Sequence, residues 1–127
     1  MPKLTPVLVV ERIEDCLPFW CDRLGFARTV EVPHGDALGF VILQLPGAEL
    51  MLQSRASVRD DLPALAEGPY RTAIYLEVDD LAPVCKALQG LPPLFAERTT
   101  FYGAREVGVA DPAGNPVIVA CAEAKGQ

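Results

Sequence analysis

The chain has 127 residues, of which half are hydrophobic, and its formal net charge is −6 at pH 7. This length allows one domain with a hydrophobic core, and the apolar content excludes a disordered chain. The acidic balance argues against nucleic acid as a partner, because such proteins need clustered Lys and Arg. No apolar run is long enough to span a bilayer, and no signal peptide is recognisable. The four cysteines lack zinc-finger spacing, so reduced thiols and a cytoplasmic location are expected.

The first half of the chain predicts one helix among four strands. A β-prone run covers residues 4–10, and a helix is expected from about Asp15 to Leu24. Its apolar stripe at helical spacing consists of Leu17, Trp20, Cys21 and Leu24. Pro18 predicts a distorted first turn, because proline has no N–H to donate. Further strands are expected over 26–33, 38–45 and 49–53, which gives residues 4–54 the order β-α-β-β-β.

The second half repeats this order after a linker. Residues 55–70 have little periodicity and are expected to form the linker, with one helical turn near 62–66. A strand over 71–78 is followed by Asp79 and Asp80, which are good N-cap residues for a helix. Strands are then expected over 94–99, 106–110 and 116–122. The predicted fold is therefore α+β, a single domain over 1–127 with a second module over about 71–123.

The last pair of strands carries the most specific signal. Asp111-Pro112-Ala113-Gly114-Asn115 is dense in turn-forming residues, and β-prone runs flank it on both sides. Two such runs around a tight glycine-containing turn predict a β-hairpin. Phe101-Tyr102-Gly103, ahead of the hairpin, predicts a bend into its first strand.

This hairpin resembles the closing hairpin of the glyoxalase / bleomycin-resistance / extradiol-dioxygenase superfamily, also called vicinal oxygen chelate proteins. The matching pattern is aromatic-Gly-x-Arg-Glu, a strand, and then Asp-Pro-x-Gly-Asn. Phe19-Trp20 and Leu24-Gly25-Phe26 are similar to the end of the family's first helix. The resemblance implies two β-α-β-β-β modules whose sheets curve around a cleft, with helices outside. It also implies a homodimer with a small-molecule ligand.

Enzymes of this superfamily hold a divalent metal in the cleft, and the resemblance places their ligand positions on this chain. Three of them fall on Thr5, Ala73 and Ile118, and the fourth falls near Gln53 or Glu49. Two of these side chains have no donor atom, whereas a catalytic metal needs about three protein ligands. We therefore expect no metal and no cofactor. One alternative is that Glu49, Gln53 and Glu77 converge on a hard cation such as Mg²⁺.

Strand alternation selects the side chains expected to face the cleft. The expected ligand contacts from alternation are Glu49, Met51, Gln53, Tyr75 and Glu77. The resemblance adds Tyr102, at the loop over the cleft mouth, and Phe40, Phe95 and Arg105 are further candidate contacts. Several of these have a structural alternative: Phe40, Phe95 and Met51 taken singly are more readily core than contacts, and Tyr75 is as readily core. Glu77 can lie exposed or pair with Arg105, and Arg105 can tie down a loop.

The favoured function is a metal-free protein that binds a small organic ligand or drug and has no catalytic residues. The alternative is a metal-dependent or acid–base lyase, isomerase or dioxygenase with a rearranged site, with Glu77 as the proton-transfer group. A third possibility is a dimer of unknown role that retains only the fold. His34 is the chain's only histidine and no Gly-x-Ser-x-Gly is present, so nucleophilic catalysis is not indicated.

Overall fold

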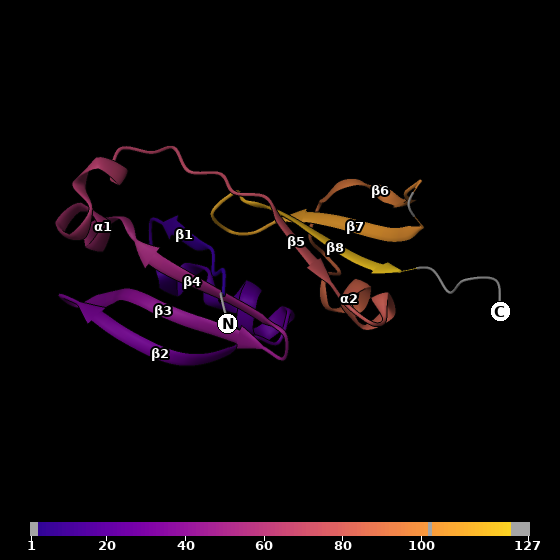
Figure 1. Ribbon diagram of the computed structural model, residues 1–127, viewed down its shortest axis with the longest axis horizontal. Helices are drawn as coiled ribbons and strands as arrows, with labels where there is room; N and C mark the ends of the chain where they lie inside the picture. Colours follow the sequence, from indigo (N-terminus) through magenta and orange to yellow (C-terminus); the bar gives the residue numbers. More distant parts are fainter. Residues whose placement is uncertain (1–2, 102, 123–127) are drawn as a thin grey trace. The chain divides into compact units, whose positions relative to one another are not determined.

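The computed structural model describes residues 3–101 and 103–122, and its chain forms two compact units, Met1–Tyr70 and Arg71–Gln127. Each unit is built around one four-stranded sheet (Figure 1). In each unit a strand is followed by helical structure and then by three more strands. The predicted α+β class, with its repeated β-α-β-β-β order, is confirmed.

The two sheets have the same connectivity. The strands of unit 1 are β1 (Val7–Val10), β2 (Ala27–His34), β3 (Ala37–Leu45) and β4 (Ala48–Ser54), in the spatial order β1-β4-β3-β2. The strands of unit 2 are β5 (Ile74–Glu77), β6 (Pro93–Thr99), β7 (Ala104–Ala110) and β8 (Pro116–Ala122), in the order β5-β8-β7-β6. In each sheet the first strand is parallel to its neighbour and the other pairs are antiparallel.

Strand register gives each residue of one sheet a counterpart in the other. Val7 pairs with Met51 across β1 and β4, and Tyr75 pairs with Ile118 across β5 and β8. Both Val7 and Tyr75 lie next to a leucine whose side chain points to the opposite face. Tyr75 is therefore the counterpart of Val7, and Ile118 is the counterpart of Met51.

The first helical segment differs from the regular helix expected over 15–24. It consists of a 3-10 turn, η1 (Ile13–Asp15), and a π-helix, η2 (Pro18–Arg23). The Leu24 amide donates to the Phe19 carbonyl, five residues earlier, at 3.2 Å. Pro18 cannot donate a helical hydrogen bond, and the wider turn changes which side chains face inward. The buried residues are Ile13, Cys16, Phe19 and Trp20, so Trp20 is buried as predicted and the other residues of the predicted stripe are half-buried.

One face of the unit 1 sheet forms its core with these helical residues. Leu50 and Leu52 of β4 are 3% and 0% exposed, and they alternate with half-buried side chains on the other face. The buried partners in β1 and β3 are Leu8, Val10, Val41 and Leu43. Burial of each such side chain contributes about 1.5–3 kcal/mol. The opposite, half-exposed face, which we call the open face of unit 1, carries Met51, Gln53 and Glu49.

The unit 2 sheet likewise has one buried face and one open face. Helix α2 (Leu81–Ala87) contacts β8, beside which it lies in Figure 1. Asp80 caps it, as predicted, by accepting a hydrogen bond from the Ala82 amide at 3.1 Å. Val117 and Val119 of β8 are fully buried on the face that α2 covers. The other face, which we call the open face of unit 2, carries Tyr75 and Glu77 of β5.

The segment expected to be a linker is more ordered than its weak periodicity suggests. Helix α1 (Arg55–Asp61) follows β4 directly, and the short helix η3 (Pro63–Leu65) comes after it. Ser54 caps α1 by accepting a hydrogen bond from the Ser57 amide at 3.1 Å, and Val58 is 1% exposed. Among the described residues, no helix is both long and apolar enough to cross a membrane.

The predicted β7–β8 hairpin is present. Ala110 pairs with Pro116, and the turn between them is closed by a hydrogen bond from the Asp111 amide to the Asn115 carbonyl at 2.9 Å. Gly114 has φ 89°, a conformation that glycine adopts without a steric penalty. The turn is therefore built by the residues that predicted it.

Candidate functional site

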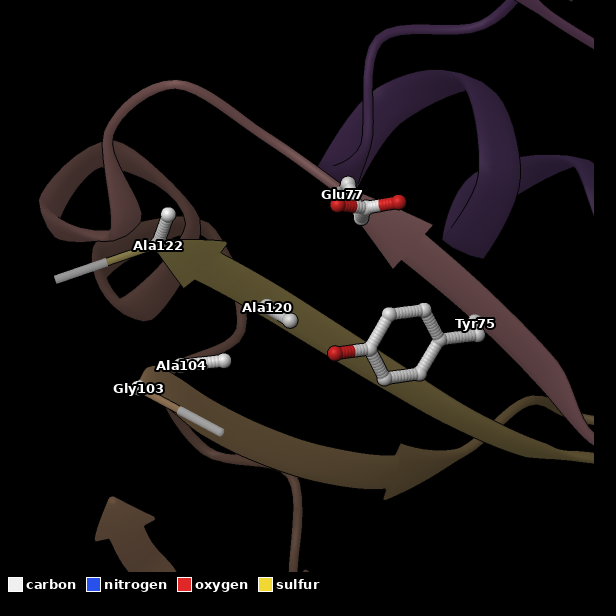
Figure 2. A pocket seen from close by; sticks show the side chains of 6 residues that line it. All are labelled: Tyr75, Glu77, Gly103, Ala104, Ala120 and Ala122. Atoms are coloured by element: carbon white, nitrogen blue, oxygen red, sulfur yellow. The ribbon is translucent and has the colours of Figure 1, made fainter. Parts of the chain in front are cut away.

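A hollow of about 440 Å³ lies on the open face of unit 2. Figure 2 shows the Tyr75 ring extending from β5 across β8, with Glu77 farther along the same strand. Tyr75 is 49% exposed. The rest of the lining is small and consists of Gly103, Ala104, Ala120 and Ala122. The floor is made of short side chains, and the side chains of Tyr75 and Glu77 are the large ones in this lining.

Comparison with unit 1 shows why the hollow forms in unit 2. Glu77 pairs with Ala120, and the counterpart pair in unit 1 is Val9 with Gln53. A glutamine side chain therefore stands where unit 2 has a methyl group. Phe40 lies opposite Gln53 on the neighbouring strand and covers the same area of the sheet.

A stacked ion pair lies on the same open face of unit 2. Glu106 pairs in register with Ala120 and is 2% exposed, and Arg98 Nε donates to its Oε1 at 3.0 Å. The Arg98 guanidinium also lies over the Phe95 ring, 3.8 Å from its centroid. A Cβ on Gly108 would lie 2.5 Å from Phe95 Cε2, so glycine is what admits the ring. Phe95 is therefore held by its neighbours and is half-buried.

Arg105 is not where a ligand contact was expected. It pairs in register with Cys121, whose Sγ donates to the Asp79 carbonyl just before α2, at 3.2 Å. Arg105 thus lies on the face that α2 covers, opposite to Glu77. Its guanidinium forms an ion pair with Glu97, which raises the pKa of Arg105. The expected approach of Arg105 to a ligand or to Glu77 is corrected accordingly.

The other predicted contacts are divided between the units. Phe40 and Met51 lie on the open face of unit 1, where they pair with Gln53 and Ile42 respectively. Tyr102 lies outside the described residues. Among the nine candidates, Tyr75 and Glu77 are the pair that the structure brings together in a hollow.

Glu49 is held in a polar cluster at the edge of the unit 1 sheet. Its Oε1 accepts from Thr5 Oγ1 at 2.8 Å and lies 2.9 Å from Lys3 Nζ. Gln44 Nε2 donates to its other oxygen. These hydrogen bonds, from Lys3 first and then Thr5 and Gln44, lower the pKa of Glu49 to about 2. The cluster joins the start of the chain to the β3–β4 hairpin.

This cluster predicts an acid-sensitive contribution to stability. The folded pKa of Glu49 lies below its ordinary value of 4.5, so the stabilisation is complete above pH 4.5 and is lost as pH falls toward 2. Wild type is expected to be more stable than Glu49→Gln at neutral pH, and the difference should shrink below pH 4.5. Urea unfolding of both proteins, from neutral pH to below pH 4.5, measures this difference in stability. A difference that stays constant down to the lowest pH would contradict the predicted role.

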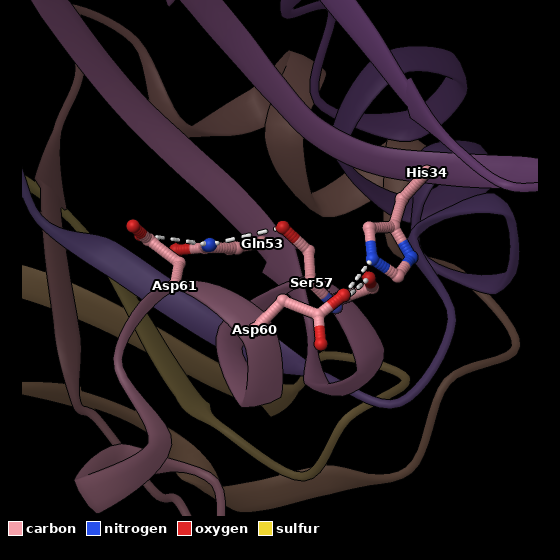
Figure 3. Close-up of polar contacts among 6 residues, drawn as sticks. His34, Gln53, Ser57, Asp60 and Asp61 are labelled. Carbon is pink, nitrogen blue, oxygen red and sulfur yellow. Dashed lines mark hydrogen bonds and ion pairs between the residues drawn. The ribbon is translucent and has the colours of Figure 1, made fainter.

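Gln53 is also engaged, as Figure 3 shows. Its Nε2 donates to Ser57 Oγ at 3.1 Å and to Asp61 Oδ2 at 3.4 Å, both in α1. His34, at the end of β2, contacts Asp60 Oδ2 of the same helix at 2.7 Å. The amide that was expected to contact a ligand thus ties α1 to the sheet.

The residues at the superfamily's metal positions do not fit a metal ion. Ala73 and Ile118 have no donor atom, and Thr5 Oγ1 donates its proton to Glu49. At the fourth position, near Gln53 or Glu49, both side chains are already engaged in hydrogen bonds within unit 1. The Lys3 ammonium beside Glu49 would repel a cation. Within residues 3–101 and 103–122, no cluster of three His, Cys, Asp or Glu side chains is arranged to hold one.

Sequence reasoning missed the residues that create the hollow. Gly103, Ala104 and Ala122 contribute to it through the absence of large side chains, and such an absence carries no chemical signal in a sequence. Strand alternation along β8 puts Ala120 and Ala122 on the same face as Ile118, which is the signal that could have found them. The Arg98–Glu106 ion pair was missed because no pattern linked the two residues.

The Glyoxalase/Bleomycin resistance protein/Dioxygenase superfamily matches residues 4–119, and the chain belongs to it. No curated protein matches the sequence significantly.

Solved structures of similar fold carry different names within this superfamily. A glyoxalase/bleomycin resistance protein/dioxygenase from Nocardioides is 21% identical, with 100% of this chain and 87% of that chain covered, at a TM-score of 0.72. A bleomycin-binding protein complexed with bleomycin is 22% identical, with 97% and 100% covered, at 0.67. A lactoylglutathione lyase from Agrobacterium tumefaciens is 19% identical, with 94% and 93% covered, at 0.72. Such identities show a shared fold and do not carry over a ligand.

Proposed function

We propose that this protein binds a small organic molecule with an aromatic ring on the open face of unit 2. The observation that carries the proposal is the half-exposed Tyr75 ring, which stands beside a floor of alanine side chains in a hollow of about 440 Å³. Ligand sites are typically concave, mostly apolar and supplied with a few polar groups. Here the polar groups are the phenol of Tyr75 and the carboxylate of Glu77.

Membership of the superfamily supports a ligand-binding function but does not identify the ligand. One protein of similar fold was solved with bleomycin bound. Binding also requires no metal, in keeping with the side chains at positions 5, 73 and 118. The acid–base enzyme considered from the sequence has no specific observation in its favour.

The test uses tryptophol, a neutral indole alcohol, as the probe. Titration is followed by the amide NMR shifts of Gly103, Ala120 and Ala122, which line the hollow. Tyr75→Ala is expected to weaken binding about three- to tenfold, because an aromatic contact contributes about 0.5–1.5 kcal/mol.

The matched control is Leu94→Ala. Leu94 is 50% exposed on β6 and does not line the hollow, so its removal should leave the affinity unchanged. If tryptophol shifts none of the lining amides, the proposed function fails. Equal losses in the two variants would mean that the ring of Tyr75 is not the contact.

We also propose that the protein forms a homodimer. Val7, Val30 and Val32 are 46%, 40% and 46% exposed, and by register they share the open face of unit 1 with Met51 and Phe40. A second copy would remove this apolar surface from water. Native mass measures this directly, and the mass of a single chain would contradict it.

A further inference from the structure

Among the residues that the structure describes, the carboxylate of Glu77 is the charged group in the lining of the hollow. The Glu77 side chain is exposed, and across residues 3–101 and 103–122 no hydrogen bond or ion pair to it is found. An ionised carboxylate only accepts hydrogen bonds, so a ligand that meets it must donate. The Tyr75 ring on the same strand adds an aromatic face, and such faces attract cations.

The arginines of β6 and β7 form ion pairs with other carboxylates. Arg98 is paired with the buried Glu106 and stacked on Phe95, and Arg105 is paired with Glu97 on the face that α2 covers. Neither salt bridge has to break for a cation to reach Glu77. In contrast, the carboxylate of Glu49 in unit 1 already has Lys3 at 2.9 Å. Within the described part of the chain, Glu77 therefore is a negative charge without a cationic partner, on the same strand as an aromatic ring.

We infer that the ligand of this hollow is a flat ring carrying a protonated amine, with the ring against Tyr75 and the ammonium on the Glu77 carboxylate. This inference rests on the proposed function, since it specifies the ligand class of the same site. A primary ammonium matches the carboxylate in charge and supplies three N–H donors. An anionic ligand of the same shape would meet repulsion.

The test compares three indoles of the same ring and different charge: tryptamine, tryptophol and indole-3-acetate. Titrations at low ionic strength should rank them in that order. Tryptamine is expected to bind about two- to fivefold more tightly than tryptophol, which is the range for an exposed ion pair. The preference should narrow as salt is added, because exposed charges are screened.

Glu77→Gln keeps the shape of the side chain and removes its charge. The variant should lose the preference for tryptamine over tryptophol. Asp79→Asn is the matched control, since Asp79 is an exposed carboxylate two residues farther along that does not line the hollow. It should retain the preference.

The outcomes separate the two proposals. If tryptophol shifts none of the lining amides, the proposed function fails and the inference fails with it. If tryptophol binds as tightly as tryptamine, or if Glu77→Gln keeps the preference, the inference alone is overturned. Loss of the preference in Asp79→Asn to the same degree would overturn it as well, because the attraction would then come from net charge and not from a local contact.

Discussion

Replacing Trp20 with alanine is expected to lower the free energy of unfolding by about 3–5 kcal/mol, the range for removal of a large aromatic core residue. Trp20 is 0% exposed and lies in the helical segment that covers the unit 1 sheet. Its ring makes edge-on contacts with Phe19 and Phe26, at centroid distances of 5.1 and 5.5 Å. Alanine would remove both contacts and leave a cavity.

Trp20 is the chain's only tryptophan, so fluorescence cannot follow this variant. Urea unfolding by circular dichroism and hydrogen exchange of the Leu43 and Leu52 amides are the measurements. Trp20→Phe is the graded control and should cost about 1–2 kcal/mol, because it keeps a ring in the site. An alanine variant that is no less stable than the phenylalanine variant would contradict the described packing.

Replacing Asp111 with alanine is expected to cost about 2–4 kcal/mol, because buried donors would lose their acceptor. Asp111 is 4% exposed, and its Oδ1 accepts from the amides of Ala113 and Asn115 at 3.0 and 2.8 Å. Its Oδ2 accepts from Asn115 Nδ2 at 3.1 Å. This last bond orients Asn115, whose Oδ1 accepts from the Thr72 amide at 2.8 Å. Loss of Asp111 would therefore loosen both the hairpin turn and the approach to β5.

Asp111→Asn should cost less than the alanine variant, since an amide oxygen can still accept from the two backbone amides. Asp36→Ala, in the exposed β2–β3 turn, is the matched control and is expected to change stability by no more than about 0.5 kcal/mol. Urea unfolding provides the comparison, and hydrogen exchange across the β7–β8 hairpin localises the effect. Similar losses at positions 36 and 111 would mean that the buried hydrogen bonds of Asp111 are not what stabilises the turn.

Local signals in the sequence predicted most of the fold. The β7–β8 hairpin was readable because Asp111, Gly114 and Asn115 determine their turn by interactions among themselves. Strands β2, β3, β4, β6 and β8 begin and end within a residue or so of the β-prone runs. Trp20 was correctly predicted as a core residue. The type of its helix was predicted wrongly, because a π-helix arises from the particular hydrogen bonds around Pro18.

The candidate site was harder to predict from the sequence, because it depends on which side chains of each strand face the hollow. Alternation was applied to β5 and β8, and there Tyr75 and Glu77 reach the same hollow. It was not applied to β7, where it would have placed Arg105 on the face opposite to Glu77. The contact between Lys3 and Glu49 joins distant parts of the chain, and no spacing rule reveals such a pair. Helix α1 depends on the Ser54 cap and on a single buried apolar residue, Val58.

The repeated strand order also has an evolutionary consequence. A chain made of two copies of one module can accept mutations in one copy while the other preserves the architecture. Here the counterparts of Tyr75 and Glu77 are Val7 and Val9, so an aromatic and an acid occupy positions that are aliphatic in the other copy. The counterpart of Ala120 is Gln53, which is tied to a helix. The side chains at positions 75, 77 and 120 could therefore be substituted together to change ligand specificity, while the repeated sheet architecture is kept.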